Sequence, residues 1–237
     1  MRNKYFVANV LINTILVGVL SIIAFFSVGG IKAQEVVGNE AVYSGNRDRK
    51  EVSLMFNVYW GTEYLEPILK ILEQNNVQTT FFIGGCWAVK NVESLKLIKD
   101  KGHEIGNHGY SHKDAEKLSY EQNYDEICLT NKVIKEILGI DVNLFAPPSG
   151  AMSGNMFKAA KDLKQTVIMW SRDTIDWRDK DVNIVTKRAT SDIQNGDFIL
   201  MHPTQHTLKA LPRVLNNLKE QGFKVTTVSA CLQPSDL

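Results

Sequence analysis

The hydrophobic pattern of this chain alternates between two periods along most of its length. Short β-rich apolar runs predict strands at residues 52–56, 79–83, 104–106, 144–146, 166–170, 198–201 and 224–228. Between them lie apolar residues at helical spacing, such as Leu65, Ile68, Leu69 and Leu72, which predict amphipathic helices. Strand and helix alternate about seven times, a pattern typical of parallel strands with right-handed crossovers. We therefore expect an α/β fold built on a parallel sheet or barrel.

The best-defined predicted helix lies between Ser119 and Gly139. Ser119 and Gln122 have the spacing of a capping box, which satisfies free backbone N–H groups at a helix start. Apolar residues then recur at helical spacing up to Gly139, and glycine commonly follows the end of a helix. Gly102 and Gly222 follow two further predicted helices in the same way.

The start of the chain has a different composition. No charged residue occurs between Tyr5 and Ile31, a stretch long enough to cross a bilayer core of about 30 Å. Arg2 and Lys4 precede it, so a cytoplasmic N-terminus and an extracytoplasmic remainder are expected. A cleaved signal peptide is the alternative because residues 31–33 end in a small residue, although its apolar region normally spans only about 7–15 residues. We expect a membrane-anchored protein with an extracytoplasmic domain, or a secreted one after cleavage.

The predicted organisation has three parts. Residues 1–35 hold one hydrophobic helix that acts as a membrane anchor or signal peptide. Residues 36–49 are polar and lack a hydrophobic period, so we expect a linker. Residues 50–237 form one domain, and with 44% hydrophobic residues in the whole chain they are sufficient for one substantial core.

Charge and cysteine content exclude several functional classes. Lys and Arg number 27 against 26 Asp and Glu, and the resulting net charge of +1 provides no field to hold a phosphate backbone. No nucleic-acid partner is therefore expected. Cys86, Cys128 and Cys231 lie far apart, which excludes a zinc knuckle and leaves at most one disulfide.

Chemically distinctive residues follow the predicted strands, where the loops of a parallel barrel carry active sites. These residues come from five strands and comprise Asn57, Tyr59, Trp60, His108, His112, Pro148, Asp176, Trp177 and His202. We expect the side chains of Asn57, His108, His112, Asp176 and His202 to converge at one end of the sheet.

His108 and His112 have the spacing of two imidazoles that can bind one divalent ion, and Zn²⁺ is the expected ion for nitrogen ligands. Histidines four residues apart also occur on ordinary surfaces, so the position after a strand is what favours a metal site. His103, at the start of a strand, is better explained as a residue that satisfies backbone groups than as a third ligand.

Asp176 and His202 form a second predicted pair. The Asp176 carboxylate would accept a hydrogen bond from His202, orient it and favour its charged form, so that His202 can act as a general acid. The alternative is that Asp176 caps a helix beside a core aromatic and that His202 has no chemical task.

Four stretches of this sequence together resemble a known family: residues 79–82, 102–108 with His112, 173–177 and 200–202. They are similar to the motifs of the polysaccharide deacetylases, the NodB homology domain of carbohydrate esterase family 4, and to a sporulation-associated branch of the YlxY type. The resemblance implies a distorted (β/α)7 barrel whose metal is held by one aspartate and two histidines. It also implies an aspartate base and an Asp–His pair that protonates the leaving amine. By this resemblance His108 and His112 are metal ligands, and Asp176 and His202 form the acid pair.

The sequence departs from the family where two successive aspartates, the base and then a metal ligand, are expected. Asn57 and Val58 stand there; an amide does not titrate near neutral pH, and valine has no ligand atom. Ala146 stands in place of an arginine that pairs with the base, and Ser149 in place of a tyrosine. With Asn57 neutral, a buried arginine would be an unpaired charge. We therefore expect the base half of the site to be missing, while the two histidines and the acid pair remain.

Three functional hypotheses follow. The first is an exported deacetylase that hydrolyses amide C–N bonds of N-acetylated polysaccharide or peptidoglycan, with Asp173 the nearest substitute base. The second is a catalytically impaired pseudoenzyme that binds such a glycan, with Tyr59, Trp60 and Trp177 stacked on sugar faces and Pro148 as a further contact. The third is an assembly factor near the membrane, for which the sequence has no specific feature. Efficient deacetylation by the two-aspartate mechanism is not expected.

Overall fold

Eight short strands form one sheet with parallel pairing in the computed structural model, which describes residues 40–234. The order along the sheet is β5-β4-β3-β2-β1-β7-β6, and β8 pairs with the first residues of β1. Neither β5 nor β6 has a second neighbour in this order, so the sheet is an open, distorted (β/α) barrel, as expected. The strands are β1 (Glu51–Val58), β2 (Thr80–Ile83), β3 (Glu104–Asn107), β4 (Leu144–Phe145), β5 (Thr166–Val167), β6 (Arg172–Asp173), β7 (Phe198–Met201) and β8 (Lys224–Thr226).

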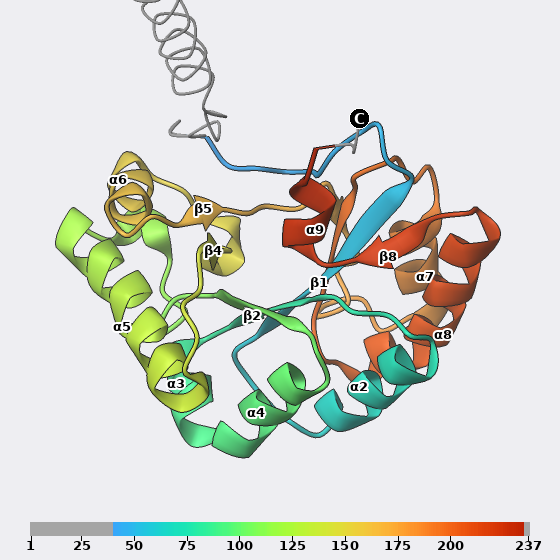
Figure 1. The fold of residues 1–237 in the computed structure, drawn as a ribbon, viewed down its shortest axis with the longest axis horizontal. Coiled ribbons are helices and arrows are strands. Elements are labelled where there is room, and N and C mark those ends of the chain that lie inside the picture. The colour runs from blue at the N-terminus through green and yellow to red at the C-terminus, as the bar shows by residue number, and fades with distance from the viewer. Residues whose placement is uncertain (1–39, 235–237) are drawn as a thin grey trace, which may run out of the picture. The chain divides into compact units, whose positions relative to one another are not determined.

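Each strand except β5 is followed by at least one α-helix, and the helices pack around the sheet (Figure 1). The predicted helix between Ser119 and Gly139 is confirmed, since Ser119 and Gln122 make both hydrogen bonds of the capping box and Gly139 ends the helix with φ 68°. The α-helices are α2 (Leu65–Gln74), α3 (Gly85–Lys90), α4 (Val92–Asp100), α5 (Tyr120–Leu138), α6 (Gly154–Asp162), α7 (Val182–Thr190), α8 (Gln205–Glu220) and α9 (Val228–Leu232), and two short 3₁₀ turns are Ala115–Lys117 and Pro148–Gly150.

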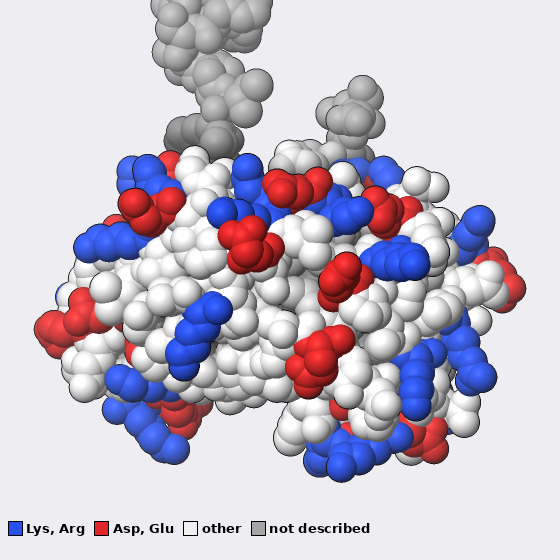
Figure 2. All heavy atoms as spheres, turned by 90° about the horizontal axis from the view of Figure 1, so that it is seen from below, with Lys and Arg blue, Asp and Glu red and all other residues white. Residues whose placement is uncertain are grey.

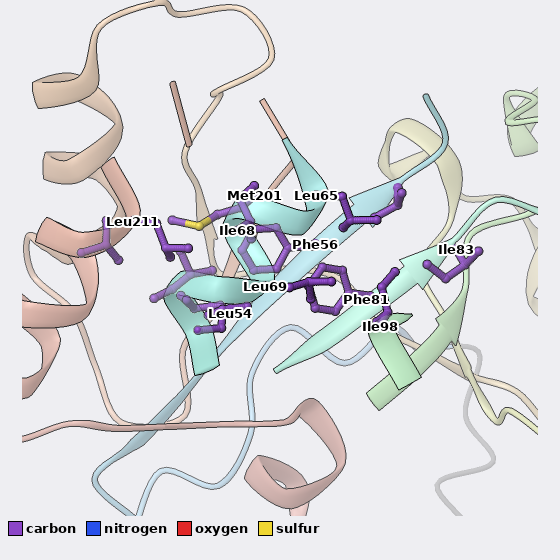
Figure 3. Packing of buried hydrophobic residues seen from close by; sticks show 14 of the residues in the cluster. Leu54, Phe56, Leu65, Ile68, Leu69, Phe81, Ile83, Ile98, Met201 and Leu211 are labelled. Atoms are coloured by element: carbon purple, nitrogen blue, oxygen red, sulfur yellow. The ribbon is translucent and has the colours of Figure 1, made fainter. Parts of the chain in front are cut away.

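The central strand β1 is buried along its whole length, and its alternating side chains enter two different clusters. Leu54, Phe56 and Val58 belong to the large cluster beneath the helices, where the Phe56 ring stacks on Phe81 at 4.9 Å (Figure 3). Met55 belongs to a smaller cluster on the other face. Each such fully buried side chain contributes about 1.5–3 kcal/mol, so this strand anchors both faces of the sheet.

One strand was not predicted. Residues Arg172 and Asp173 form β6 beside β7, whereas the sequence placed them in a loop. A two-residue strand of charged residues has no hydrophobic alternation from which it can be recognised. The strand predicted at 166–170 is likewise shorter, because pairing with β4 ends at Val167.

Residues 41–47 of the predicted linker are bound to the domain and are called the N-terminal strap here. Val42 bridges Ile168 just beyond β5, and Ser44 bridges Asp197 just before β7. The backbone N–H of Asn46 also donates to the Cys231 carbonyl oxygen at 2.7 Å. In Figure 1 this blue segment runs along one edge of the domain before it enters β1. These contacts are made by backbone groups, so they leave no periodic pattern in the sequence.

The predicted hydrophobic helix within residues 1–35 lies outside the described residues. Among residues 40–234, no helix combines the length and apolar composition that crossing a membrane requires. Cys86, Cys128 and Cys231, which all lie in this part, are free thiols.

Charged side chains of both signs are interspersed on the face shown in Figure 2. Several ion pairs are local and exposed, such as Lys96 with Glu93 at 3.0 Å and Lys117 with Asp114 at 2.9 Å. Exposed pairs contribute only about 0–1 kcal/mol each. The stability of the fold therefore depends mainly on its core.

Two glycine substitutions test the contribution of the strap. Gly196 has φ 76°, and a Cβ added there would lie 2.7 Å from the Gly45 carbonyl oxygen of the strap. Gly139 has a similar φ of 68°, but a Cβ added there would have no neighbouring atom within 4 Å. Gly139→Ala should lower the free energy of unfolding by about 1 kcal/mol through backbone strain alone, and Gly196→Ala by about 3 kcal/mol because it also displaces the strap. Urea unfolding measures both, and equal losses would show that the strap contributes nothing.

Candidate functional site

A pocket of about 270 Å³ opens where the carboxyl ends of the strands meet. Four of the residues predicted to converge there, Asn57, His108, His112 and His202, line it, and Asp176 is hydrogen-bonded to His202. The predicted convergence is therefore confirmed. The lining residues are Asn57, Tyr59, His108, His112, Ser149, Trp170, Asp173, Trp177, Leu200 and His202.

Asp176 and His202 follow the neighbouring strands β6 and β7 and are held together by two hydrogen bonds. The His202 backbone N–H donates to Asp176 Oδ2 at 2.7 Å, and His202 Nδ1 donates to Oδ1 at 2.8 Å. The Thr207 hydroxyl also donates to Oδ2. Because a carboxylate only accepts, Nδ1 carries the hydrogen and Nε2 of His202 is left for a ligand. The predicted hydrogen bond is confirmed, while the role of the pair in acid catalysis stays a prediction.

Thr207 is a site residue that the sequence did not reveal. Thr204 caps α8, and its Oγ1 accepts a hydrogen bond from the Thr207 backbone N–H at 3.1 Å. The Thr207 hydroxyl donates to the Asp176 carboxylate. Two threonines three residues apart after a histidine are the only signal, and they predict a helix cap rather than a link to a carboxylate.

His108 follows β3 and is 1% exposed. Its Nδ1 donates to the Ala146 carbonyl oxygen at 2.8 Å, so Nε2 holds a lone pair, and this buried atom has no hydrogen-bond partner. Burial, with the neighbouring His112, lowers the pKa of His108 to about 3. The ring therefore remains a neutral acceptor that is oriented by backbone, as a metal-binding histidine is.

His112 lies beside His108, with ring centroids 5.1 Å apart, and adopts φ 54°. The Tyr59 ring stacks on its imidazole at 3.5 Å with an interplanar angle of 19°. Burial lowers the pKa of His112 and raises that of Tyr59. The loop after β1 therefore covers one of the two predicted metal ligands with an aromatic ring.

The residues present do not fit the three-ligand metal site implied by the resemblance. Val58 is fully buried in the large hydrophobic cluster with Phe56 and does not line the pocket, while Asn57 does. Within residues 40–234, no three His, Cys, Asp or Glu side chains are grouped closely enough to hold an ion. His108 and His112 could supply two nitrogen ligands, but the carboxylate ligand is missing.

Of the four residues predicted to contact sugar, Tyr59 and Trp177 line the pocket, whereas Trp60 and Pro148 do not. Trp177 is 57% exposed at the pocket rim, and Tyr59 lines the pocket beside His112. Trp60 lies outside the pocket lining with its ring 5.3 Å from that of His202. Pro148 is buried and also does not line the pocket, whereas the next residue, Ser149, does so with φ 55°.

His103 lies outside this site, where the strands begin. The Thr79 backbone N–H donates to its Nδ1 at 3.2 Å, which agrees with the prediction that it satisfies a backbone group. It is 6% exposed, and burial, with a smaller contribution from Lys101, lowers its pKa to about 4.

The family model for polysaccharide deacetylase matches residues 44–168. The chain belongs to the polysaccharide deacetylase family. It is 38% identical over 198 residues to the uncharacterized protein YlxY of Bacillus subtilis, a match that covers 84% of this chain and 62% of YlxY. It is also 31% identical over 198 residues to a peptidoglycan-N-acetylglucosamine deacetylase of Bacillus cereus, over 81% of this chain and 72% of that enzyme.

The fold is also similar to that of BA3943 of Bacillus anthracis, described as a pseudoenzyme of carbohydrate esterase family 4. The TM-score is 0.80 with 38% identity, over 83% of this chain and 70% of that structure. A BA3943 mutant described as having restored enzymatic activity gives the same TM-score at 37% identity, over 83% and 72% of the two chains. This polysaccharide deacetylase domain therefore resembles both active enzymes and a pseudoenzyme.

The buried state of His103 predicts a loss of stability in acid. Its pKa is about 4 in the folded domain and about 6.5 when unfolded, so the unfolded chain binds more protons between these values and stability falls as pH falls through this window. The free energy of unfolding should fall by up to about 1 kcal/mol per pH unit for this residue. His103→Asn keeps an acceptor for Thr79, so it should flatten the profile measured by urea unfolding. An unchanged slope would contradict this assignment.

Proposed function

We propose that this domain is a catalytically impaired polysaccharide deacetylase that binds an amino-sugar glycan of the cell wall without efficient hydrolysis. The observation that carries the proposal is the carboxyl end of β1. Asn57 faces the pocket with an amide in place of the base, and Val58 lies in the hydrophobic core in place of a metal ligand. Loss of a positioned base alone lowers a rate by about 10²- to 10⁴-fold.

The retained residues support binding of a sugar. Trp177 is an exposed aromatic residue at the rim of the pocket, and the rings of Tyr59 and Trp170 also line it. His108 and His202 keep hydrogen-bonding nitrogens that are oriented by Ala146 and Asp176. Sugar sites commonly combine aromatic faces with a few oriented polar groups.

Two of the similar proteins support this proposal, one for the glycan class and one for impaired catalysis. The B. cereus relative is named for action on peptidoglycan N-acetylglucosamine, and BA3943 is described as a pseudoenzyme. We transfer the N-acetylated glycan class from the first and the impaired catalysis from the second.

We propose further that the domain is extracytoplasmic and attached to the membrane through residues 1–35, or secreted after their removal. The uncharged stretch from Tyr5 to Ile31, preceded by Arg2 and Lys4, supports this location.

Residual deacetylation is the second candidate function. The Asp176–His202 pair is complete, and Asp173 lines the same pocket as a possible proton acceptor. A divalent ion, with Zn²⁺ the expected one, would polarise the acetamide carbonyl when bound, but only His108 and His112 remain to hold it. The two candidates differ in whether acetate is released.

An acetate-release assay on chitooligosaccharide and peptidoglycan, with zinc added, separates them. The unmodified chain should release little acetate, and Asn57→Asp or Val58→Asp alone should change this little. The two together should raise release by about 10²-fold or more, and Ala146→Arg should raise it further by pairing with the new base. These effects are non-additive because base, ligand and arginine act on one water.

Two outcomes would contradict impaired catalysis. One is comparable acetate release by the unmodified chain and the triple variant. The other is substantial release that His112→Ala abolishes and the matched change His206→Ala, outside the pocket, leaves intact.

The burial of Val58 gives a separate stability prediction. Val58→Asp places a carboxylate in the hydrophobic cluster, so the free energy of unfolding should fall by about 2–4 kcal/mol without metal. By the family resemblance position 58 supplies a metal ligand beside His108 and His112. Added zinc should therefore restore part of this loss by drawing the end of β1, with its new carboxylate, toward the two histidines. Val58→Asn introduces polarity without charge and should respond less to zinc. Thermal unfolding with and without zinc measures both, and an aspartate variant as stable as the unmodified chain and insensitive to zinc would refute the prediction.

A further inference from the structure

The pocket wall is rich in hydrogen-bond acceptors and contains no strong cation. Among the described residues that line it, none is lysine or arginine. Within the described part of the chain, Asp173 is the one carboxylate that lines the pocket, and its Oδ1 accepts the Ile175 backbone N–H at 2.8 Å. The guanidinium of Arg178 lies near the rim but pairs with Asp179 at 2.9 Å. The wall is therefore suited to a ligand that brings its own positive charge.

Two acceptors on this wall are buried and have no donor. His108 Nε2 keeps a lone pair because Nδ1 donates to a carbonyl oxygen, and no protein group reaches it. Asn57 Oδ1 is likewise buried without a partner. An unsatisfied buried acceptor is unfavourable, so a ligand that donates to either atom gains affinity by satisfying it.

The chemistry of these acceptors distinguishes the two forms of an amino sugar. An acetamide has one N–H, a carbonyl oxygen that itself seeks a donor, and a methyl group. A free amino group is protonated to an ammonium, which is compact and carries three donors and a positive charge. The Tyr59 ring is already stacked on His112, and the Arg178 guanidinium lies 5.9 Å from the centre of the Trp177 ring, so the preference depends on the acceptors and on Asp173 rather than on these rings.

We propose that the pocket recognises a de-N-acetylated hexosamine residue through its ammonium group, in preference to the N-acetylated residue. Asn57 and His108 accept from the ammonium, and Asp173 supplies the opposite charge. The pocket volume of about 270 Å³ is near the lower end for small-molecule sites, which suits one sugar residue of a chain. This inference rests on the proposed binding of a cell-wall amino-sugar glycan and changes the preferred ligand from the N-acetylated glycan to the product of its deacetylation.

The test compares two oligosaccharides of equal length, one built of glucosamine and one of N-acetylglucosamine. Isothermal titration uses the whole chain, freed of metal with a chelator, at a slightly acidic pH that keeps the amines protonated. The glucosamine oligomer should bind about tenfold or more tightly, because its charge-assisted hydrogen bonds satisfy buried acceptors. Equal binding, or preference for the acetylated oligomer, would overturn this inference and leave glycan binding intact. Binding of neither would overturn both.

Variants separate the pocket from general charge attraction. Asp173→Asn should remove most of the preference, whereas Asp141→Asn, the same change at a side chain that is 82% exposed outside the pocket, should leave it unchanged. Asn57→Asp should tighten binding of the glucosamine oligomer by adding a carboxylate, a gain that misfolding cannot produce. Equal losses in the Asp173 and Asp141 variants, or no gain in the Asn57 variant, would refute the proposal.

Discussion

Burial of β1 on both faces is the constraint on which the fold and the site jointly depend. Its side chains alternate between the large hydrophobic cluster and the interior that leads to the pocket, so the register of this strand decides what faces a ligand. A charged side chain can remain at its carboxyl end only if a cation or ion offsets its burial. Asn57 and Val58 carry no charge and leave a strand that is stable without either.

The loss of catalytic groups has not removed the scaffold that orients the remaining ones. Ala146 lacks the family's arginine side chain, yet its backbone carbonyl still fixes the His108 ring. Asp176 likewise holds His202 through both its backbone and its ring, with Thr207 on the same carboxylate. Orientation by backbone groups survives a change of neighbouring side chain, which explains how a site can lose its base and keep its shape.

The sequence predicted those parts of the fold and site whose signals are local. The capping box at Ser119 and the strands with long apolar runs were recovered, and the common position of site residues after parallel strands predicted their convergence. The strap and β6 were missed because their pairing partners are distant and their residues show no period. Stacking of Tyr59 on His112 was also not predictable, since it depends on a loop conformation with positive φ at His112.

The N-terminal strap determines how a mechanical load would enter the domain. A force applied to the chain ahead of Glu40 first reaches Val42, whose backbone groups are hydrogen-bonded to Val167 of β5 and to Met169 just beyond it. It then reaches Gly45 and Asn46, which are bonded to the turn before β7 and to α9. The force is divided among three distant segments before it reaches β1. A force applied there would therefore load these strap contacts before it reached the strand that shapes the pocket.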